Sequence, residues 1–224
     1  MKMLQQVHQL FDLTRLQDLS MLTLLSVGIS FLLRCCELIW CDKTDHHLRA
    51  GGVSFSYNAK NKPTHVHIEI PSSKTDVKPC SRSIKATKSP TCAVAILHRY
   101  LQAAKLKESD PLFPQITRAK LSVVISTLAG IIDPKLATKM GTHSLRIGGT
   151  TSLASGGRVP GHLIKKFGRW RSDLWEQIYK ELTDESYELL ANQLSADDAW
   201  ATDGIETPTA SIIAALGKVI DARL

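Results

Sequence analysis

The chain has 224 residues, a formal net charge of +7, and 43% hydrophobic residues. This length suits one domain with room for an appendage, and the hydrophobic content is sufficient for a sizeable core. The apolar run from Ser20 to Leu33 spans fourteen residues, whereas a membrane-spanning helix needs about 20, so this run is excluded as a transmembrane segment. Met1 to Leu19 is mixed in charge and lacks the apolar stretch of a signal peptide, so none is expected.

Apolar residues at helical spacing predict a long first helix over residues 16–41. Three strands are expected next, near 52–57, 64–70 and 80–86, with a polar turn joining the first two. Further helices are expected near 91–106, 117–131, 143–155, 160–167, 173–180 and 183–194. The order of elements predicts a mainly α-helical α+β fold with a small antiparallel three-stranded sheet.

Histidines and cysteines suggest neither a metal site nor a disulfide framework. His65 and His67 share one face of the expected second strand, but no third ligand is apparent, so no metal is expected. The five cysteines, at positions 35, 36, 41, 80 and 92, form no C-x-x-C pair. Their odd number and irregular spacing favour reduced, buried thiols in an intracellular protein.

Charge is distributed unevenly toward the C-terminus. Between Pro134 and Ser172 there are eight Lys or Arg residues and no Asp or Glu, whereas Asp173 to Glu206 holds ten acidic residues and one basic residue, Lys180. A basic run is often only a solvated surface, but this one coincides with the motifs described next and suits contact with phosphates. The candidate DNA contacts are Lys139, Lys165, Lys166, Arg169 and Arg171. The acidic segment is not expected to touch DNA.

Two motifs within the basic region carry residues that can hold a phosphate. His143 and Arg146 stand at i and i+3, which places them on one face of a helix. Trp170 follows in Gly168-Arg169-Trp170, and Tyr179 lies nine residues further on. Arginine offers a planar fork to two phosphate oxygens, and His and Trp can donate to the same group. Taken singly, Trp170 and Tyr179 could equally be packing residues.

Two more cations complete the set: Arg34, three residues before Glu37, and Lys74 in Ser73-Lys74-Thr75. Taken singly, Arg34 could be a helix residue paired with Glu37, and Lys74 a solvated hairpin lysine. Together with His143, Arg146, Trp170 and Tyr179, these residues give the chain a pattern that resembles the catalytic domain of the tyrosine recombinase (phage integrase) family. The resemblance spans roughly residues 10–190 and depends on order and spacing together. The amino-acid sequences of the His143 and Trp170 motifs particularly resemble those of recombinases of Crypton and DIRS mobile elements and their phage relatives.

The resemblance implies a DNA breaking and rejoining fold and assigns a role to each residue. Tyr179 would attack a DNA phosphate, His143 would act as base, and Lys74 would protonate the leaving oxygen. Arg34 and Arg146 would neutralise the phosphate, Trp170 would donate its N–H, and Glu37 would orient Arg34 or neighbouring backbone. The implied partner is double-stranded DNA bound by a homo-oligomer, a tetramer, without metal or other cofactor.

Two alternatives remain open: a domesticated, non-catalytic DNA-binding relic, and relaxation activity like that of a type IB topoisomerase. The sequence begins almost at the expected first helix of the catalytic domain, so the N-terminal core-binding domain of the family is expected to be absent from it. The chain would then be a fragment, a shortened descendant, or one part of a protein whose other half is encoded elsewhere. The expected compartment is the nucleus for a eukaryotic source, and the cytoplasm, nucleoid or host cell for a bacterial or phage source.

The C-terminal segment follows the motif residues. We divide the chain into a catalytic domain over 1–200 and a linker with an amphipathic helix over 201–224. The aliphatic residues of that helix recur at helical spacing, at positions 212, 213, 216, 219 and 220, so the helix must bury one face. By resemblance, residues 209–222 would dock in trans on a neighbouring DNA-bound protomer, and in cis or loosely in the free protein. Permanent packing against its own core is the alternative.

Overall fold

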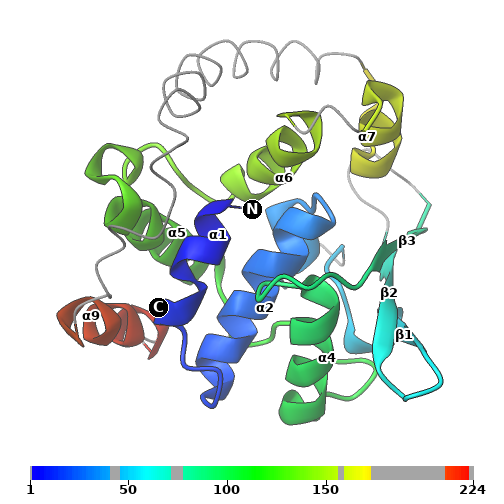
Figure 1. Cartoon of the computed structure of the whole chain (residues 1–224), viewed down its shortest axis with the longest axis horizontal. Coiled ribbons are helices and arrows are strands. Elements are labelled where there is room, and N and C mark those ends of the chain that lie inside the picture. Colours follow the sequence, from blue (N-terminus) through cyan, green and yellow to red (C-terminus); the bar gives the residue numbers. More distant parts are fainter. Residues whose placement is uncertain (1, 41–45, 72–77, 156–158, 173–209, 222–224) are drawn as a thin grey trace.

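The computed structural model describes residues 2–40, 46–71, 78–155, 159–172 and 210–221. One antiparallel sheet, with strand order β1-β2-β3, lies along one side of the helices, at the right of Figure 1. The strands are β1 (Val53–Tyr57), β2 (Pro63–Ile70) and β3 (Cys80–Lys85). The expected combination of helices with a small three-stranded antiparallel sheet is therefore confirmed.

The α-helices are α1 (Lys2–Val7), α2 (Leu16–Ser30), α3 (Cys35–Leu38), α4 (Ala93–Ala104), α5 (Arg118–Ile132), α6 (Ser144–Ser155), α7 (Gly161–Gly168) and α9 (Ala210–Asp221). Short 3₁₀ helices occur at η1 (His8–Leu10), η2 (Ala50–Gly52) and η3 (Pro134–Leu136). The expected helices near 173–180 and 183–194 lie outside the described residues. Within the described ranges, no helix combines the length and the apolar character needed to cross a bilayer.

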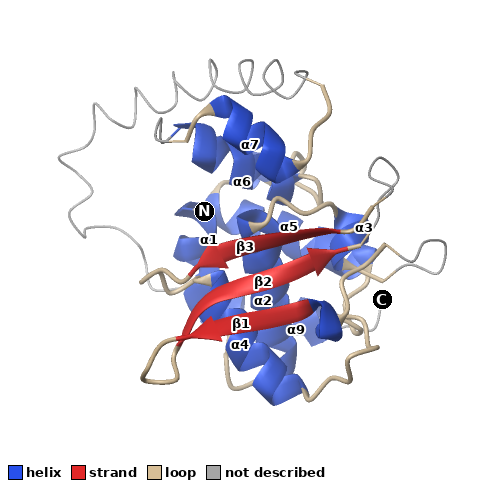
Figure 2. Cartoon of the chain, turned by 90° about the vertical axis from the view of Figure 1, so that its right-hand side faces the viewer, coloured by secondary structure: helices blue, strands red, loops and turns tan. Residues whose placement is uncertain are grey.

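Helix α2 forms the centre of the core. It contacts α4, α6 and α9, and Met21, Leu22, Leu24 and Val27 on it are fully buried. The sheet covers one side of this helical layer, as Figure 2 shows, and β2 packs against α4. Every second residue of β2 from Val66 to Ile70 is fully buried, because alternate side chains of a strand point to the same face.

The expected continuous helix over residues 16–41 is wrong, because α2 ends at Ser30 and the chain turns before α3 begins at Cys35. Leu32 adopts a left-handed conformation with φ of 53°. The backbone N–H of Leu33 donates to Gly28 O at 3.0 Å, and that of Leu32 donates to Ile29 O at 3.4 Å. These bonds form a Schellman ending, which usually has glycine at the left-handed position. The turn directs Arg34 and Glu37 away from the axis of α2.

The C-terminal helix α9 packs on the core of its own chain. Leu216 and Ile220 belong to the same hydrophobic cluster as α2 and α5, and both are fully buried. Asp221 accepts a hydrogen bond from the Arg15 guanidinium at the start of α2. In this structure α9 therefore occupies the cis position, and it completes the domain core rather than standing apart from it.

Close contact between α2 and α6 depends on a glycine. A Cβ atom placed on Gly149 would lie 2.3 Å from Ile29 O and 2.5 Å from a methyl carbon of Leu32. The adjacent Gly148 has nothing within 4 Å of the same position. Gly149 therefore sets how near α6 can approach the end of α2, whereas Gly148 is open to a side chain.

We predict that Gly149→Ala lowers the free energy of unfolding by about 1–3 kcal/mol, because the new methyl group overpacks a backbone contact. Gly148→Ala is the matched control and should raise the stability by about 0.5–1 kcal/mol, since alanine is the better helix former. Urea unfolding followed by circular dichroism measures both changes. Equal effects of the two substitutions would contradict the proposed α2–α6 contact.

Candidate functional site

Four residues from three segments of the chain converge near the N-terminus of α6. Arg34 occupies the N-cap of α3, His143 directly precedes α6, Arg146 lies in its first turn, and Trp170 follows α7. The Arg146 guanidinium carbon lies 4.2 Å from the centroid of the Trp170 ring. The charges of Arg146 and Arg34 both act on the His143 imidazole. These four predicted site residues therefore form one cluster, whereas Lys74 and Tyr179 lie outside the described residues.

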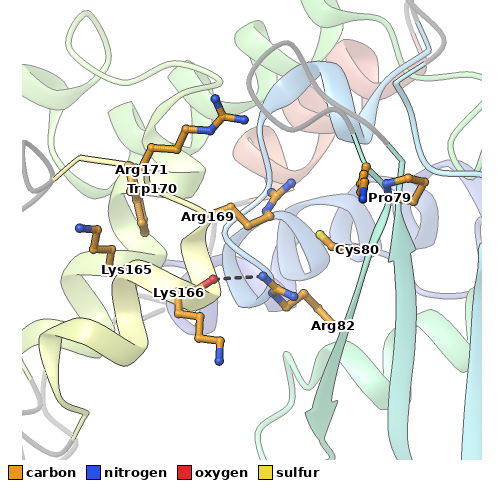
Figure 3. Close-up of a pocket in the computed structure, with 9 residues that line it drawn as sticks. Pro79, Cys80, Arg82, Lys165, Lys166, Arg169, Trp170 and Arg171 are labelled. Atoms are coloured by element: carbon orange, nitrogen blue, oxygen red, sulfur yellow. Dashed lines mark hydrogen bonds between the residues drawn. The ribbon is translucent and has the colours of Figure 1, made fainter.

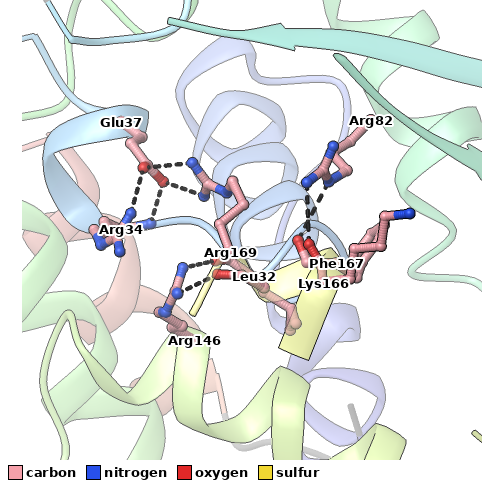
Figure 4. A network of polar contacts seen from close by, with 9 residues as sticks. Leu32, Arg34, Glu37, Arg82, Arg146, Lys166, Phe167 and Arg169 are labelled. Atoms are coloured by element: carbon pink, nitrogen blue, oxygen red, sulfur yellow. Dashed lines mark hydrogen bonds and ion pairs between the residues drawn. The ribbon is translucent and has the colours of Figure 1, made fainter. Parts of the chain in front are cut away.

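Arg146 joins three segments of the chain. Its side chain is buried, and Nη1 donates to Leu32 O at 2.5 Å while Nη2 donates to Gly168 O (Figure 4). The first carbonyl belongs to the left-handed residue after α2, and the second to the last residue of α7. The indole of Trp170 covers the guanidinium in a cation–π contact. Arg146 therefore fixes both chain turns against α6.

Glu37 is fully buried and serves two arginines, as Figure 4 shows. Its Oε1 and Oε2 each accept a bond of 2.7 Å from Arg169. The backbone N–H of Arg34 donates to Oε2 at 2.7 Å, and Arg34 Nη1 donates to Oε1 at 3.1 Å. The contact expected between Glu37 and Arg34 is present, with Arg169 as an additional partner.

The charge of Glu37 depends on that pairing. Burial acts to raise the pKa of the carboxyl, but the hydrogen bonds and charges of Arg169, followed by those of Arg34, outweigh burial and hold the pKa below its ordinary value of 4.5. A lowered folded pKa means that the contribution to stability is complete above the unfolded value and is lost as the pH falls through the folded value. Glu37 is therefore an ionised structural residue at neutral pH.

Arg169 differs from the surface position expected of a DNA contact. Its side chain is buried, and both terminal nitrogens bind Glu37. Its backbone is left-handed, with φ of 61°, because it forms the Schellman ending of α7. The correction to the expected role follows from this burial: Arg169 holds Glu37 in place. A count of charges along the sequence contains no information about which cation turns inward.

Trp170 is placed by the turn that Arg169 makes. Its backbone N–H donates to Lys165 O at 3.1 Å, and its ring lies across Gly168. A Cβ atom on Gly168 would be only 1.6 Å from the indole, so glycine is required for the ring to reach Arg146. Trp170 was expected either to pack in the core or to donate its N–H to a phosphate. The position of this half-buried side chain beside Arg146 is compatible with both roles.

The remaining predicted DNA contacts lie at or near the surface. Lys139, Lys166 and Arg171 are exposed, and Lys165 is half-buried. Three of these residues, Lys165, Lys166 and Arg171, line a hollow together with Lys78 and Arg82 (Figure 3). Lys78 and Arg82 were not among the predicted contacts, because neither belongs to the basic run. Finding them requires knowing that β3 lies beside α7, which only the folded structure shows.

His143 is exposed, and its inner side adjoins the arginine cluster. Loss of water on that side, followed by repulsion from Arg146 and Arg34, holds the pKa of the imidazole below its ordinary value of 6.5. The ring is therefore neutral at pH 7. A neutral imidazole can accept a proton from a neighbouring hydroxyl group, and the exposed position leaves it accessible to a bound molecule.

Among the described residues, no three or more His, Cys, Asp or Glu side chains lie close enough together to hold a metal ion. His67 Nε2 instead shares a hydrogen bond of 2.9 Å with Ser56 Oγ, and His65 contacts the Thr64 hydroxyl. The described cysteines at positions 35, 36, 80 and 92 form no disulfide with one another. Of these, Cys92 is buried as expected, whereas Cys36 is exposed, so the expectation of buried thiols is wrong for Cys36.

Comparison with solved structures identifies the fold. The sequence itself matches no family model and no curated protein. The structure matches XerH site-specific recombinase bound to a palindromic difH substrate in a post-cleavage complex, with a TM-score of 0.57, 17% identity, and coverage of 85% of this chain and 51% of that chain. It also matches XerH bound to difH in a pre-cleavage complex, with a TM-score of 0.56, 16% identity, and coverage of 83% and 50%.

These matches show that the chain has a fold found in a site-specific recombinase. At this level of identity the likeness concerns the fold alone. The chain spans about half the length of the XerH chains that it matches. The arginine, histidine and tryptophan cluster described above lies within this fold.

We predict that the His143 ring titrates with a midpoint below 6.5 in the DNA-free protein, because its inner side loses water and lies near two arginines. This group should make the protein less stable as the pH falls below 6.5, since the unfolded chain then binds the proton more tightly. Arg34→Gln removes one repelling charge and should move the midpoint upward. Proton NMR of the imidazole measures both values, and a wild-type midpoint at or above 6.5 would refute the described environment.

Proposed function

We propose that this chain is the catalytic domain of a tyrosine recombinase, which cleaves and rejoins DNA strands through a 3′-phosphotyrosyl intermediate. One observation carries the proposal: Arg34, the pair His143 and Arg146, and Trp170, from three separate segments, form one cluster in a chain with a recombinase fold. The order of these residues in the sequence is the order that the family resemblance requires. Independent packing of three unrelated segments gives no reason for these side chains to meet.

The proposed reaction is a balanced exchange of phosphate esters. Tyr179 Oη attacks the phosphorus of a DNA phosphodiester, its proton passes to His143, and the bond from phosphorus to the 5′ oxygen breaks. Lys74 supplies the proton that the departing oxygen takes up. Rejoining reverses these steps with a 5′ hydroxyl as nucleophile, so no ATP is consumed, because the phosphotyrosyl ester retains the free energy of the broken bond.

Charge on the phosphate is the main obstacle to this attack. A tyrosine with an ordinary pKa near 10 is a poor nucleophile at pH 7, so the phosphate must be activated. Arg34 and Arg146 supply positive charge, and the indole N–H of Trp170 supplies a neutral donor. The lowered pKa of His143 keeps the imidazole in the form that accepts a proton. All the cations in this mechanism are side chains, so the reaction requires no metal.

Double-stranded DNA is the proposed substrate and partner. The XerH structures that share the fold contain difH substrate, and this chain presents exposed cations beside its cluster. We extend the proposal to a homo-tetramer assembled on DNA, and to a source among mobile elements of the Crypton, DIRS or phage kind. The proposed compartment is intracellular, where DNA is accessible.

One observation favours a second candidate, a DNA-binding domain without catalytic activity. Arg146 is 3% exposed, and its two terminal nitrogens donate to the carbonyls of Leu32 and Gly168. A phosphate bound by this guanidinium would have to share it with these two carbonyls and with the Trp170 ring. In a relic, Arg146 would retain only its structural role.

We predict that Tyr179→Phe abolishes the covalent adduct with a nicked suicide substrate while DNA affinity is nearly unchanged, because only the nucleophilic oxygen is lost. Tyr187→Phe is the matched control and should form the adduct normally. Denaturing gels measure the adduct, and peptide mapping identifies the linked residue. Linkage through Tyr187 would show that the assignment of the nucleophile is wrong.

The same assay separates the two candidate functions. Arg34→Ala should lower the cleavage rate by about 10²–10³, as expected for one lost donor in a preorganised site. Cleavage by the wild-type protein should persist in excess EDTA. A wild-type protein that binds DNA but forms no adduct supports the non-catalytic candidate, and strict dependence on Mg²⁺ would overturn the proposed mechanism.

A further inference from the structure

A basic hollow lies beside the candidate site, between the start of β3 and the end of α7. It has a volume of about 510 Å³, and residues of both elements line it, as Figure 3 shows. Lys78, Cys80 and Arg82 form one wall. Lys165, Lys166 and Arg171 form the other. The two walls are therefore separated by more than eighty residues in the sequence.

The lining of this hollow is strongly positive. Among the described residues that form it, six carry cationic side chains and none carries a carboxylate. Arg169 is one of the six, but its charge is matched by Glu37 behind the wall. The remaining five cations belong to both walls, so their fields add in the space between them. A concave surface lined by one sign of charge concentrates ions of the opposite sign.

Arg82 fixes the distance between the walls. From β3 its Nη2 donates to Lys166 O at 3.0 Å and its Nε donates to Phe167 O at 3.3 Å. These carbonyls belong to the last turn of α7, where an arginine interacts favourably with the negative end of the helix. A third bond of 2.9 Å runs from Nη1 to Ser81 O on its own strand. The planar guanidinium therefore acts as a spacer, and the hollow has a defined width.

Trp170 connects the hollow to the candidate site. Its ring covers Arg146 in the cluster, and the same residue lines the hollow. Successive phosphates of one DNA strand follow at about 3.4 Å of helix rise, so a strand with one phosphate at the cluster presents further phosphates close by. Lysine and arginine side chains are the usual partners of such backbone phosphates.

We propose that this hollow binds a backbone phosphate of the DNA strand adjacent to the reacting phosphate, with Arg82 as the positioning residue that holds its two walls together. This inference rests on the proposed function for the identity of the ligand. The contact is independent of base sequence, because it involves only the phosphodiester backbone. It fixes the register of the strand, so the reacting phosphate is aligned with the cluster.

The test compares two double variants of the full chain with equal changes in net charge. Lys78→Gln with Lys166→Gln removes one ammonium group from each wall. Lys60→Gln with Lys85→Gln removes two exposed ammonium groups near the other end of the sheet, where Lys85 of β3 pairs with His65 and Lys60 lies in the β1–β2 turn. Affinity for a fluorescein-labelled DNA duplex of mixed sequence is measured by anisotropy over a series of salt concentrations.

We expect the magnitude of the slope of log K against log salt concentration to fall by about 0.9 in the hollow variant, as for one lost phosphate contact. The control pair should leave the slope unchanged. Arg82→Lys keeps the charge but cannot make the paired bonds to α7, so affinity should also fall several-fold in this variant. Equal slopes in the hollow and control variants, or wild-type affinity in Arg82→Lys, would overturn the proposal.

Cys80 gives a second measurement at the same place. Its free thiol lines the hollow, so bound DNA should slow its alkylation by iodoacetamide, as mapped by mass spectrometry. The protection should be lost in the variant with both Lys78 and Lys166 replaced. Wild-type DNA binding without protection of Cys80 would also overturn the proposal.

These outcomes are separate from the outcome of the cleavage assay. If the protein forms no covalent adduct but shows the expected slope change and Cys80 protection, the catalytic proposal is refuted and the proposed phosphate site is supported. A protein that cleaves DNA normally while the hollow variants bind like wild type retains the catalytic proposal and refutes the phosphate site.

Discussion

The buried ion pair between Glu37 and Arg169 is the interaction on which the arrangement of the cluster depends. A carboxylate without exposure to solvent is strongly disfavoured unless it is fully paired, and here two arginines and a backbone N–H satisfy it. A buried pair of this kind adds little net stability compared with apolar packing, but loss of one partner leaves an unmatched buried charge. The pair therefore acts mainly by fixing geometry: it ties the start of α3, which carries Arg34, to the end of α7, which precedes Trp170.

Two left-handed residues end the helices that Arg146 joins. Leu32 ends α2 and Arg169 ends α7, and each stands where a helix ending favours glycine. A left-handed conformation costs about 1–2 kcal/mol for such residues. Arg146 offsets this cost by binding Leu32 O and Gly168 O, and Glu37 does so by binding the Arg169 side chain. Arg146, which we propose for phosphate chemistry, is therefore bound into the backbone turns that place it.

Sequence patterns predicted the helices and strands in which apolar residues recur at regular spacing. They missed the turns and side-chain orientations that depend on contacts between distant segments. Alternating apolar residues located β2 within one residue, and helical spacing located α5 and α6 nearly as well. The break after α2 was missed because the apolar run continues through it and no glycine marks the turn. The short α1 was missed because the first 19 residues are mixed in charge. The resemblance to a family singled out Arg34, His143, Arg146 and Trp170, which lie in one cluster, and their roles stay predictions. The inward orientation of Arg169 and the place of Arg82 follow only from the fold.

A double-mutant cycle between Glu37 and Arg169 tests this account most directly. The free energy of unfolding is measured by urea titration for the wild-type protein, Glu37→Gln, Arg169→Met and the protein with both substitutions. Each single change should cost about 3–5 kcal/mol, because it leaves a buried charge without its partner. The double variant should lose less than the sum of the single losses, by about 0.5–3 kcal/mol, since both charges are then absent. Additive losses would contradict the account, because they would mean that the two side chains do not hold each other in the folded protein.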